Sequence, residues 1–457
     1  MLLSERDSFV ENLILFSRVA DGWQHVAATI KPTGNFDWIE VYYKYYNQSG
    51  TAWFDNPRLE VGPSHTFNGY DDGGNYVTSV TDPLGNISKF TYDAFGNILS
   101  SEDPKNKTTN FVYDSRNLLT QVTDAKNGIT KYGYDNAGNR TTVTDARNKT
   151  TTYDYNEFNQ VSKITNPLNQ AIQFGYNKNG QNVKTVFPKS DSITSSYNAL
   201  NRLEGVFYNG VQKWGYTYDA NGNVTAVNNI AAGITTTNIY DKNDRIVNVQ
   251  EGPNNQFDYG YDGNSNLISL TLTAATTSHQ YSYAYDSLDQ MTALSWEGSD
   301  PAKYIYDERG NVISERNANE TYTAREYDGS NRLTAIRNYN AAGSILSSYT
   351  YSYDQNNNRT SVVTGGGAIN YQYDQLNRLT QETLPDGTSI NYEYDATGNR
   401  TKKTVGSTVT NYTYNDGNQL TAVSGQTYTY DANGNLTNNG AKNFVYNEVN
   451  QLTQVKD

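Results

Sequence analysis

One phrase recurs through most of the chain, a tyrosine followed at once by aspartate or asparagine. The early tyrosines of this series keep a constant spacing, as Tyr92, Tyr113 and Tyr134 do, whereas later steps vary and the last two are shorter. Such regularity identifies a repeat protein, in which each unit packs mainly against its neighbours. The marker tyrosines are Tyr92, Tyr113, Tyr134, Tyr155, Tyr176, Tyr197, Tyr218, Tyr240, Tyr261, Tyr285, Tyr306, Tyr327, Tyr353, Tyr373, Tyr394, Tyr414, Tyr430 and Tyr446.

The repeats alternate between two endings, so the full unit is two such steps. In one ending the marker pair is followed by two variable residues and then Gly-Asn, as from Tyr92 to Asn97. In the other, Asn or Asp is followed by Arg or Gln and an aliphatic residue, as from Tyr373 to Leu379. Ser265 and Asn357 replace the glycine in two units. The alternation predicts two turns of different geometry, one at each edge of the structure.

Each step of the repeat has room for two short strands and two turns. An aromatic residue precedes most marker tyrosines by two positions, as Phe90 precedes Tyr92, so both side chains point to one face. We expect these rings to line a buried face and to pair across neighbouring strands. A second turn, such as residues 145–148, follows about half a step later, and no helical period is visible.

The residue after each marker tyrosine is predicted to start a turn. Its carboxylate or amide oxygen can accept hydrogen bonds from backbone N–H groups two or three residues on. The glycine supplies a positive φ, for which asparagine is the next best residue. We therefore assign a structural role to the repeat markers Tyr92, Asp93, Gly96, Asn97, Tyr134, Asp135, Gly138, Tyr218, Asp219, Gly222, Tyr306, Asp307, Gly310, Tyr394, Asp395 and Gly398.

Composition excludes several classes of protein. A net charge of −13 argues against a nucleic-acid partner, which requires a basic surface. No apolar run is long enough to cross a membrane, and residues 1–20 lack the features of a signal peptide. The absence of cysteine excludes disulfides, and the 40 tyrosines predict a core of rings whose hydroxyls need hydrogen-bond partners.

The combined pattern, Tyr-Asp-x-x-Gly-Asn with a later Asp-x-x-Gly turn and a closing (Tyr/Phe)-x-Tyr-Asp, resembles the Rhs/YD repeat. That family includes bacterial Rhs polymorphic toxins, wall-associated proteins of Gram-positive bacteria, the B–C components of insecticidal toxin complexes, and teneurins. The resemblance covers residues 70–457. It implies a long spiral antiparallel β-sheet that forms a hollow shell, often around a toxic C-terminal domain. Neither the terminal plug nor the cleavage motif of the toxin-bearing members is visible, so we expect a fragment of a longer polypeptide.

Residues 1–66 do not repeat and are predicted to form short β-strands. They resemble the second half of the β-sandwich carbohydrate-binding modules of bacterial extracellular proteins. Trp23, Trp38 and Trp53 are candidates for stacking on sugar rings, although a role in the core is favoured. In that family the residue that matches Asp55 often touches calcium, but the half that would supply the other ligands is missing. We predict a partial β-sandwich over residues 1–66 and an array of about 18 repeats over residues 67–457.

No catalytic constellation emerges from the sequence. His25, His65 and His279 are scattered, without a nucleophile or acid at a recognised spacing. Recurrence of the acidic position in near-equivalent units favours turn capping over the paired carboxylates of glycosidases. We therefore predict an all-β, non-catalytic protein that needs no cofactor and no metal.

The predicted function is structural. We expect a shell or stalk segment of a secreted or cell-surface bacterial Rhs/YD protein, which encloses or displays an effector domain absent from this chain. The expected partners are that C-terminal effector or other shell segments, and the signal peptide is expected outside this chain. The alternative is a carbohydrate-binding or adhesion module that contacts cell-surface glycans.

Overall fold

The computed structural model describes residues 2–5, 8–11, 36–40, 66–299 and 301–457. These residues form strands and turns and no helix, which confirms the predicted all-β class. The chain divides into two compact units, Met1–Thr108 and Thr109–Asp457. The predicted domain boundary after residue 66 stays a prediction.

The N-terminal unit contains two groups of strands. A three-stranded antiparallel sheet has the order β2-β1-β3, with β1 (Leu2–Glu5), β2 (Ser8–Glu11) and β3 (Phe36–Glu40). Four further strands pair antiparallel in chain order: β4 (Phe67–Tyr70), β5 (Val77–Thr81), β6 (Ile87–Tyr92) and β7 (Ile98–Glu102).

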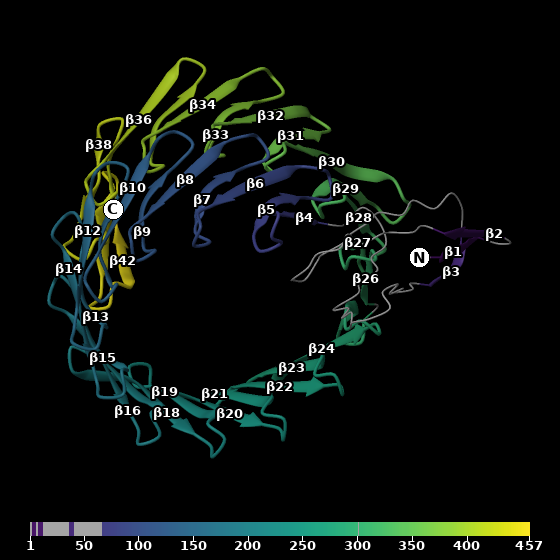
Figure 1. Cartoon of the computed structure of the whole chain (residues 1–457). Coiled ribbons are helices and arrows are strands. Elements are labelled where there is room, and N and C mark those ends of the chain that lie inside the picture. Colours follow the sequence, from purple (N-terminus) through teal and green to yellow (C-terminus); the bar gives the residue numbers. More distant parts are fainter. Residues whose placement is uncertain (1, 6–7, 12–35, 41–65, 300) are drawn as a thin grey trace, which may run out of the picture. The chain divides into compact units, whose positions relative to one another are not determined.

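From β8, which begins at the boundary residue Thr108, to β38, the strands follow one another as an antiparallel sheet in chain order. This sheet is open (Figure 1). Strands of four to nine residues predominate, as expected for hairpins that fit a short repeat. They are β8 (Thr108–Tyr113), β9 (Leu119–Thr123), β10 (Ile129–Tyr134), β11 (Arg140–Thr144), β12 (Thr150–Tyr155), β13 (Val161–Thr165), β14 (Ala171–Tyr176), β15 (Asn182–Val186), β16 (Ser192–Tyr197), β17 (Leu203–Tyr208), β18 (Val211–Tyr218), β19 (Val224–Asn229), β20 (Ile234–Tyr240), β21 (Ile246–Glu251), β22 (Asn255–Tyr261), β23 (Leu267–Ala274), β24 (Thr277–Tyr285), β25 (Met291–Trp296), β26 (Ala302–Tyr306), β27 (Val312–Arg316), β28 (Tyr322–Tyr327), β29 (Leu333–Tyr339), β30 (Ile345–Tyr353), β31 (Arg359–Thr364), β32 (Gly367–Tyr373), β33 (Leu379–Thr383), β34 (Ser389–Tyr394), β35 (Arg400–Val405), β36 (Thr408–Tyr414), β37 (Leu420–Val423) and β38 (Gln426–Thr427).

The strand pairing is interrupted near residue 428, although one continuous sheet was expected over all the repeats. After β38 a separate four-stranded antiparallel sheet begins, made of β39 (Thr429–Tyr430), β40 (Leu436–Asn438), β41 (Asn443–Tyr446) and β42 (Leu452–Lys456). The backbone N–H of Tyr428 bonds to the carbonyl of Thr421 at 2.8 Å. The repeats are shortest here, and two-residue strands give too little ladder to carry the pairing through.

Every marker tyrosine ends a strand, and the turn that follows it lies at one edge of the sheet. We call these YD turns, and the turns at the opposite edge return turns. Because each repeat contains two strands, both endings of the repeat fall at the same edge. The expectation that the two endings occupy opposite edges is therefore wrong. A register shift just before the tyrosine, as between Gly133 and Tyr134, sets the entry into each YD turn.

The aromatic face is half-buried and not the buried face that the sequence predicts. In β6 the less exposed residues are Ser88, Phe90 and Tyr92, as the two-residue period requires. Among the described residues, Ala335 and Val362 are the only buried hydrophobic side chains. The reason is architectural, since the described repeats form a single layer and no second described sheet packs on the aromatic face (Figure 1).

Candidate functional site

The YD turn is a five-residue loop closed by its first residue. In the turn from Asp135 to Asn139, the Asp135 N–H bonds to the Asn139 carbonyl at 3.0 Å, and the Gly138 N–H bonds to the Asp135 carbonyl at 3.2 Å. One carboxylate oxygen of Asp135 accepts the N–H groups of Ala137 and Asn139, both at 2.9 Å. The other accepts the Asn139 side-chain amide at 2.9 Å. The capping bonds of this turn thus reach two residues on, as predicted, and also four residues on.

Both endings of the repeat adopt this geometry. Gly138 has φ +87° and Asn159, at the same place in the next turn, has φ +58°. The two substitutes for glycine, Ser265 and Asn357, also have positive φ, at 75° and 66°. The prediction that the two endings form turns of different geometry is therefore wrong.

The alternation instead links neighbouring turns. In the Gly-Asn ending, the Asn139 amide donates to the Asn159 side chain of the next turn at 2.8 Å. In the other ending, the Arg202 guanidinium donates to the Asp219 carbonyl at 2.9 Å and lies 4.6 Å above the Tyr218 ring. Each type of turn bonds forward to the next type, so a line of hydrogen bonds runs along the edge.

The marker tyrosines form a second line of contacts. The Tyr218 hydroxyl donates to the backbone carbonyl of Leu203, in the preceding hairpin, at 2.6 Å. This bond provides the tyrosine hydroxyl with a hydrogen-bond partner. Because it recurs in successive hairpins, the tyrosine rings lie in one row. Equivalent bonds of 2.7–2.8 Å join Tyr92 to Val77, Tyr134 to Leu119, Tyr306 to Met291 and Tyr394 to Leu379.

Hydrogen bonding keeps the capping carboxylates ionised. The side-chain amide of Asn139, acting against partial burial and together with backbone N–H groups, holds the pKa of Asp135 below its ordinary value. Asn97 does the same for the pKa of Asp93. A carboxylate whose lone pairs are occupied in this way is a structural acceptor and a poor general base. Within the described ranges, no group of three or more His, Asp or Glu side chains could hold a metal ion.

The second unit curls so that a late stretch of the chain lies beside an early stretch. We call residues 119–231 the early segment and residues 367–457 the late segment. Figure 1 shows the yellow late strands beside the blue early strands, and the side-chain contacts agree. Return turns of the early segment, together with Lys213 in β18, meet the YD turns of the late segment, and we call this contact the seam.

Cations on the early side of the seam face anions on the late side. Lys126 Nζ lies 3.3 Å from Asp374 Oδ2, and Lys149 Nζ lies 2.8 Å from Asp416 Oδ1. Further pairs join Arg147 to Asp395 at 3.7 Å, Lys189 to Asp431 at 3.5 Å and Lys213 to Glu448 at 3.3 Å.

Direct hydrogen bonds and an apolar contact complete the seam. The Arg147 guanidinium donates to the Asn415 carbonyl at 2.8 Å. The backbone N–H of Lys189 donates to Asn433 Oδ1, also at 2.8 Å. Leu168 fills the space above Gly417, where an added Cβ would lie 2.9 Å from Leu168 Cδ1. The seam is therefore a fitted contact and not a chance approach.

The ionised state of the late side follows from the same contacts. Burial pushes the pKa of Asp431 up, but hydrogen bonds from Asn435 and the Lys189 charge outweigh it and hold that pKa low. A bond from its own backbone N–H and the Lys213 ammonium lower the pKa of Glu448. The attraction across the seam is thus present at neutral pH.

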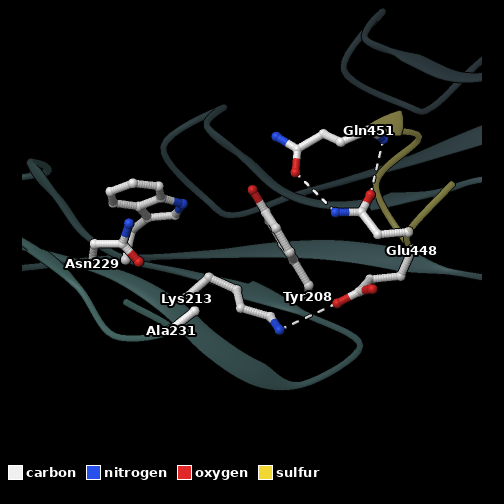
Figure 2. Close-up of a pocket in the computed structure, with 8 residues that line it drawn as sticks. Tyr208, Lys213, Asn229, Ala231, Glu448 and Gln451 are labelled. Atoms are coloured by element: carbon white, nitrogen blue, oxygen red, sulfur yellow. Dashed lines mark hydrogen bonds and ion pairs between the residues drawn. The ribbon is translucent and has the colours of Figure 1, made fainter. Parts of the chain in front are cut away.

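A cleft of about 230 Å³ lies at one end of the seam. Figure 2 shows Lys213 and Glu448 pointing toward one another beside the Tyr208 ring. The amide of Asn447 donates to Gln451 on the late side of the same cleft at 2.9 Å. The lining combines early residues Tyr208, Lys213, Trp214, Asn229 and Ala231 with late residues Asn447, Glu448 and Gln451.

The structure brings some sequence-predicted residues together and leaves others apart. Asp395 joins the seam, whereas the caps Asp135, Asp219 and Asp307 stand on the YD edge of other hairpins. The glycan candidates Trp23 and Trp53 fall outside the described residues, and Trp38 lies within β3. Sequence reasoning missed the seam, although its signal was visible. The third residue of successive return turns is Lys126, Arg147, Leu168 and Lys189, at the same spacing as the early marker tyrosines.

The family model described as Teneurin YD-shell matches residues 189–351 and 367–457, more than half of the chain. The chain belongs to the teneurin YD-shell family. The RHS Repeat model matches the YD-shell protein at residues 70–108, 113–150 and 138–171. These matches confirm that it is an Rhs/YD-repeat protein.

Solved structures show the same YD-shell fold at low sequence identity. The Photorhabdus luminescens Tc holotoxin pore is 16% identical, with a TM-score of 0.67 over 81% of this chain and 24% of that one. The TcdB2-TccC3 structure is 17% identical, with the same TM-score over 81% of this chain and 25% of that one. This YD-shell chain therefore spans about a quarter of the neighbours that it matches.

Curated relatives match a short stretch. The tRNA nuclease WapA of Bacillus subtilis strain 168 is 35% identical over 75 residues, 16% of this chain and 3% of the nuclease. A tRNA3(Ser)-specific nuclease WapA of Bacillus spizizenii matches to the same extent. No helix in the described part of the YD-shell chain has the length and apolarity needed to span a membrane.

Proposed function

We propose that this chain is a wall segment of a hollow YD-repeat shell, in a secreted or cell-surface bacterial protein, around an effector domain outside this chain. The seam is the observation that carries the proposal. A sheet that returns on itself, with early and late hairpins joined edge to edge, forms a continuous wall and not an open ribbon. Edge-to-edge contact also covers turn edges that would otherwise face water.

A non-catalytic role is part of the proposal. The recurrent aspartates accept hydrogen bonds as turn caps, which supports a structural role for them and not a catalytic one. The nuclease activity named for the WapA relatives belongs to those proteins, and the matched stretch is 3% of their length. No observation favours the glycan-binding alternative, because its candidate tryptophans lie in the N-terminal part of the chain, where no side chain is described.

A pair of adjacent residues can test enclosure, because the chain contains no cysteine. Thr151 shares the face of Tyr153 and Tyr155 in β12, whereas Thr152 is exposed on the opposite face. We would place Thr151→Cys and Thr152→Cys in the complete polypeptide made by the producing bacterium. A small maleimide and a bulky polymer-linked maleimide would then label each variant.

If the sheet is a shell wall, the bulky reagent labels only the outward cysteine, while the small reagent labels both. In the isolated chain both reagents label both cysteines. Equal bulky labelling of the two faces in the complete polypeptide overturns enclosure. Recovery of that polypeptide only from the cell interior overturns the proposed location.

A further inference from the structure

The YD turns between residues 156 and 290 form an exposed edge, which we call the early YD rim. This edge resembles the late side of the seam without its cover. Three of these turns have a large apolar residue at the third position that is exposed to solvent. They are Phe158, Leu200 and Leu288, with exposed fractions of 81%, 69% and 75%. At the same turn position in the late segment, Leu376 and Val449 are half-buried where the seam covers them. Large apolar side chains at projecting tips mark an interaction surface.

The rim also carries ionised caps of the kind that bind cations in the seam. Asp219, Asp241 and Asp262 each bond to backbone N–H groups within their own turns. The equivalent carboxylates Asp374 and Asp431 show that such a cap can hold a lysine at the same time. The rim therefore offers acidic sites one hairpin apart, about 10 Å for two strand spacings. The turns with apolar tips lie on either side of this acidic stretch along the chain.

The return turns of this chain carry different residues at the third position, which is the position that would contact such a rim. Early return turns carry Lys126, Arg147 and Lys189 at their third position. Later return turns with the same backbone closure carry Asn319, Ala342 and Asp386 instead. The tips of these later turns are exposed. At these turns a second copy of this chain thus presents neutral or acidic tips to the acidic caps of the rim.

We infer that the early YD rim is a docking surface for another YD-repeat segment, one whose return turns carry lysine or arginine at the third position. The lysines or arginines of that segment would pair with the capping carboxylates of the rim. Apolar residues at its other return turns would cover Phe158, Leu200 and Leu288. The same rule disfavours head-to-tail stacking of this chain on itself, because the three later return turns named above lack the cations. The inference goes beyond the proposed function, since it holds whether or not the sheet encloses an effector.

A gain-of-function variant tests the rule in the full chain. The triple variant Asn319→Lys, Ala342→Lys, Asp386→Lys gives the free return turns the missing cations. We expect wild type to stay monomeric and the triple variant to form head-to-tail oligomers at low salt, with apparent mass rising at least two-fold in light scattering. Addition of about 0.5 M salt should reverse most of this association.

A control variant carries Thr152→Lys, Asp154→Lys and Gln372→Lys, which change the net charge equally but lie on an exposed strand face. A second control adds Asp219→Asn, Asp241→Asn and Asp262→Asn to the return-turn variant. Asparagine caps keep the turn, as Asn156 does through bonds of 2.9 and 3.0 Å. Circular dichroism verifies the fold of each protein.

Oligomers in the return-turn variant, their loss on Asp→Asn replacement and a monomeric strand-face control together support the inference. A monomeric return-turn variant overturns it. Equal association of the strand-face control, or association that survives the Asp→Asn replacements, also overturns it. Wild type that stacks through this rim contradicts the second part of the rule.

Discussion

The two residues of the marker pair act on different neighbours. The tyrosine hydroxyl reaches back to the preceding hairpin, whereas the aspartate closes the turn that follows. Their adjacency in sequence therefore couples a contact between hairpins to the closure of a hairpin. This double task explains why the pair recurs while the residues around it vary.

Replacement of Tyr218 should separate the two parts of the tyrosine contact. Tyr218→Phe removes the bond to the Leu203 carbonyl and should cost about 1 kcal/mol of local stability. Tyr218→Ala also removes the ring and should cost roughly 2–3 kcal/mol, below the range for a fully buried aromatic because the ring is half-buried. Hydrogen exchange should speed up in β17, β18 and β19 and stay unchanged in β34, since repeats couple mainly to neighbours. Uniform loss of protection along the sheet would contradict this.

The lowered pKa of Asp135 predicts a specific response to acid. Because its carboxyl has a lower pKa folded than unfolded, the unfolded chain binds protons first as the pH falls. Its contribution to stability is complete above about pH 4 and is lost as the pH drops through the lower folded pKa. Asp135→Asn keeps the cap without the titration, so its unfolding free energy should depend less on pH below about 4. Identical pH profiles for wild type and variant would show that this cap does not couple to folding.

At the scale of the element, a hairpin accepts either ending of the repeat, because both endings place a residue with positive φ at the fourth position of the YD turn. Gly222 has φ +98° and Asn201, in the preceding YD turn, has φ +61°. Glycine and asparagine adopt this region at low cost, whereas other residues do so with strain. The choice between the two endings is then free to serve contacts between turns.

Substitution at Gly222 should reveal this backbone demand. No atom lies within 4 Å of the place where a Cβ would be added, so any cost comes from conformation and not from collision. Gly222→Ala should lower the stability of the β18–β19 hairpin by about 1–2 kcal/mol, and Gly222→Asn by less than about half of that. Hydrogen exchange of the two strands measures both. An asparagine variant as unstable as the alanine variant would mean that side-chain bulk decides.

At the scale of the whole second unit, the seam joins hairpins that lie far apart in sequence, as Lys126 and Asp374 do. Each ion pair is partly exposed and contributes roughly 0–1 kcal/mol. Their number gives the contact its strength, and their matching order along the two segments sets its register. The return of the sheet on itself is therefore a collective property of several hairpins.

Loss of two seam lysines should loosen the late hairpins without unfolding them. Lys126→Ala with Lys189→Ala should lower exchange protection in the turns at residues 374–378 and 431–435 by roughly five-fold, for about 1 kcal/mol lost. High salt should produce a similar change in wild type. The control is Lys178→Ala with Lys242→Ala, which removes the same charge from the exposed YD rim. Equal loosening by the control would show that net charge, and not the seam, is responsible.

The sequence by itself determined the local structure of this protein. The recurring Tyr-Asp pair, the two-residue aromatic spacing and the Gly or Asn at the fourth position of most YD turns specify strand, turn and face. Each depends on backbone sterics and on hydrogen bonds within a few residues, which one repeat contains. The family resemblance rests on the same local pattern.

Only the tertiary structure decided what these hairpins do together. It placed both endings at one edge, because the side of a turn depends on how many strands precede it. It left the aromatic face half-buried, because a single layer provides no opposing surface. It also decided that Lys126 meets Asp374, since the partner of a return turn depends on how many hairpins complete the curl. Twist and curvature accumulate over many strands, and no single repeat encodes their sum.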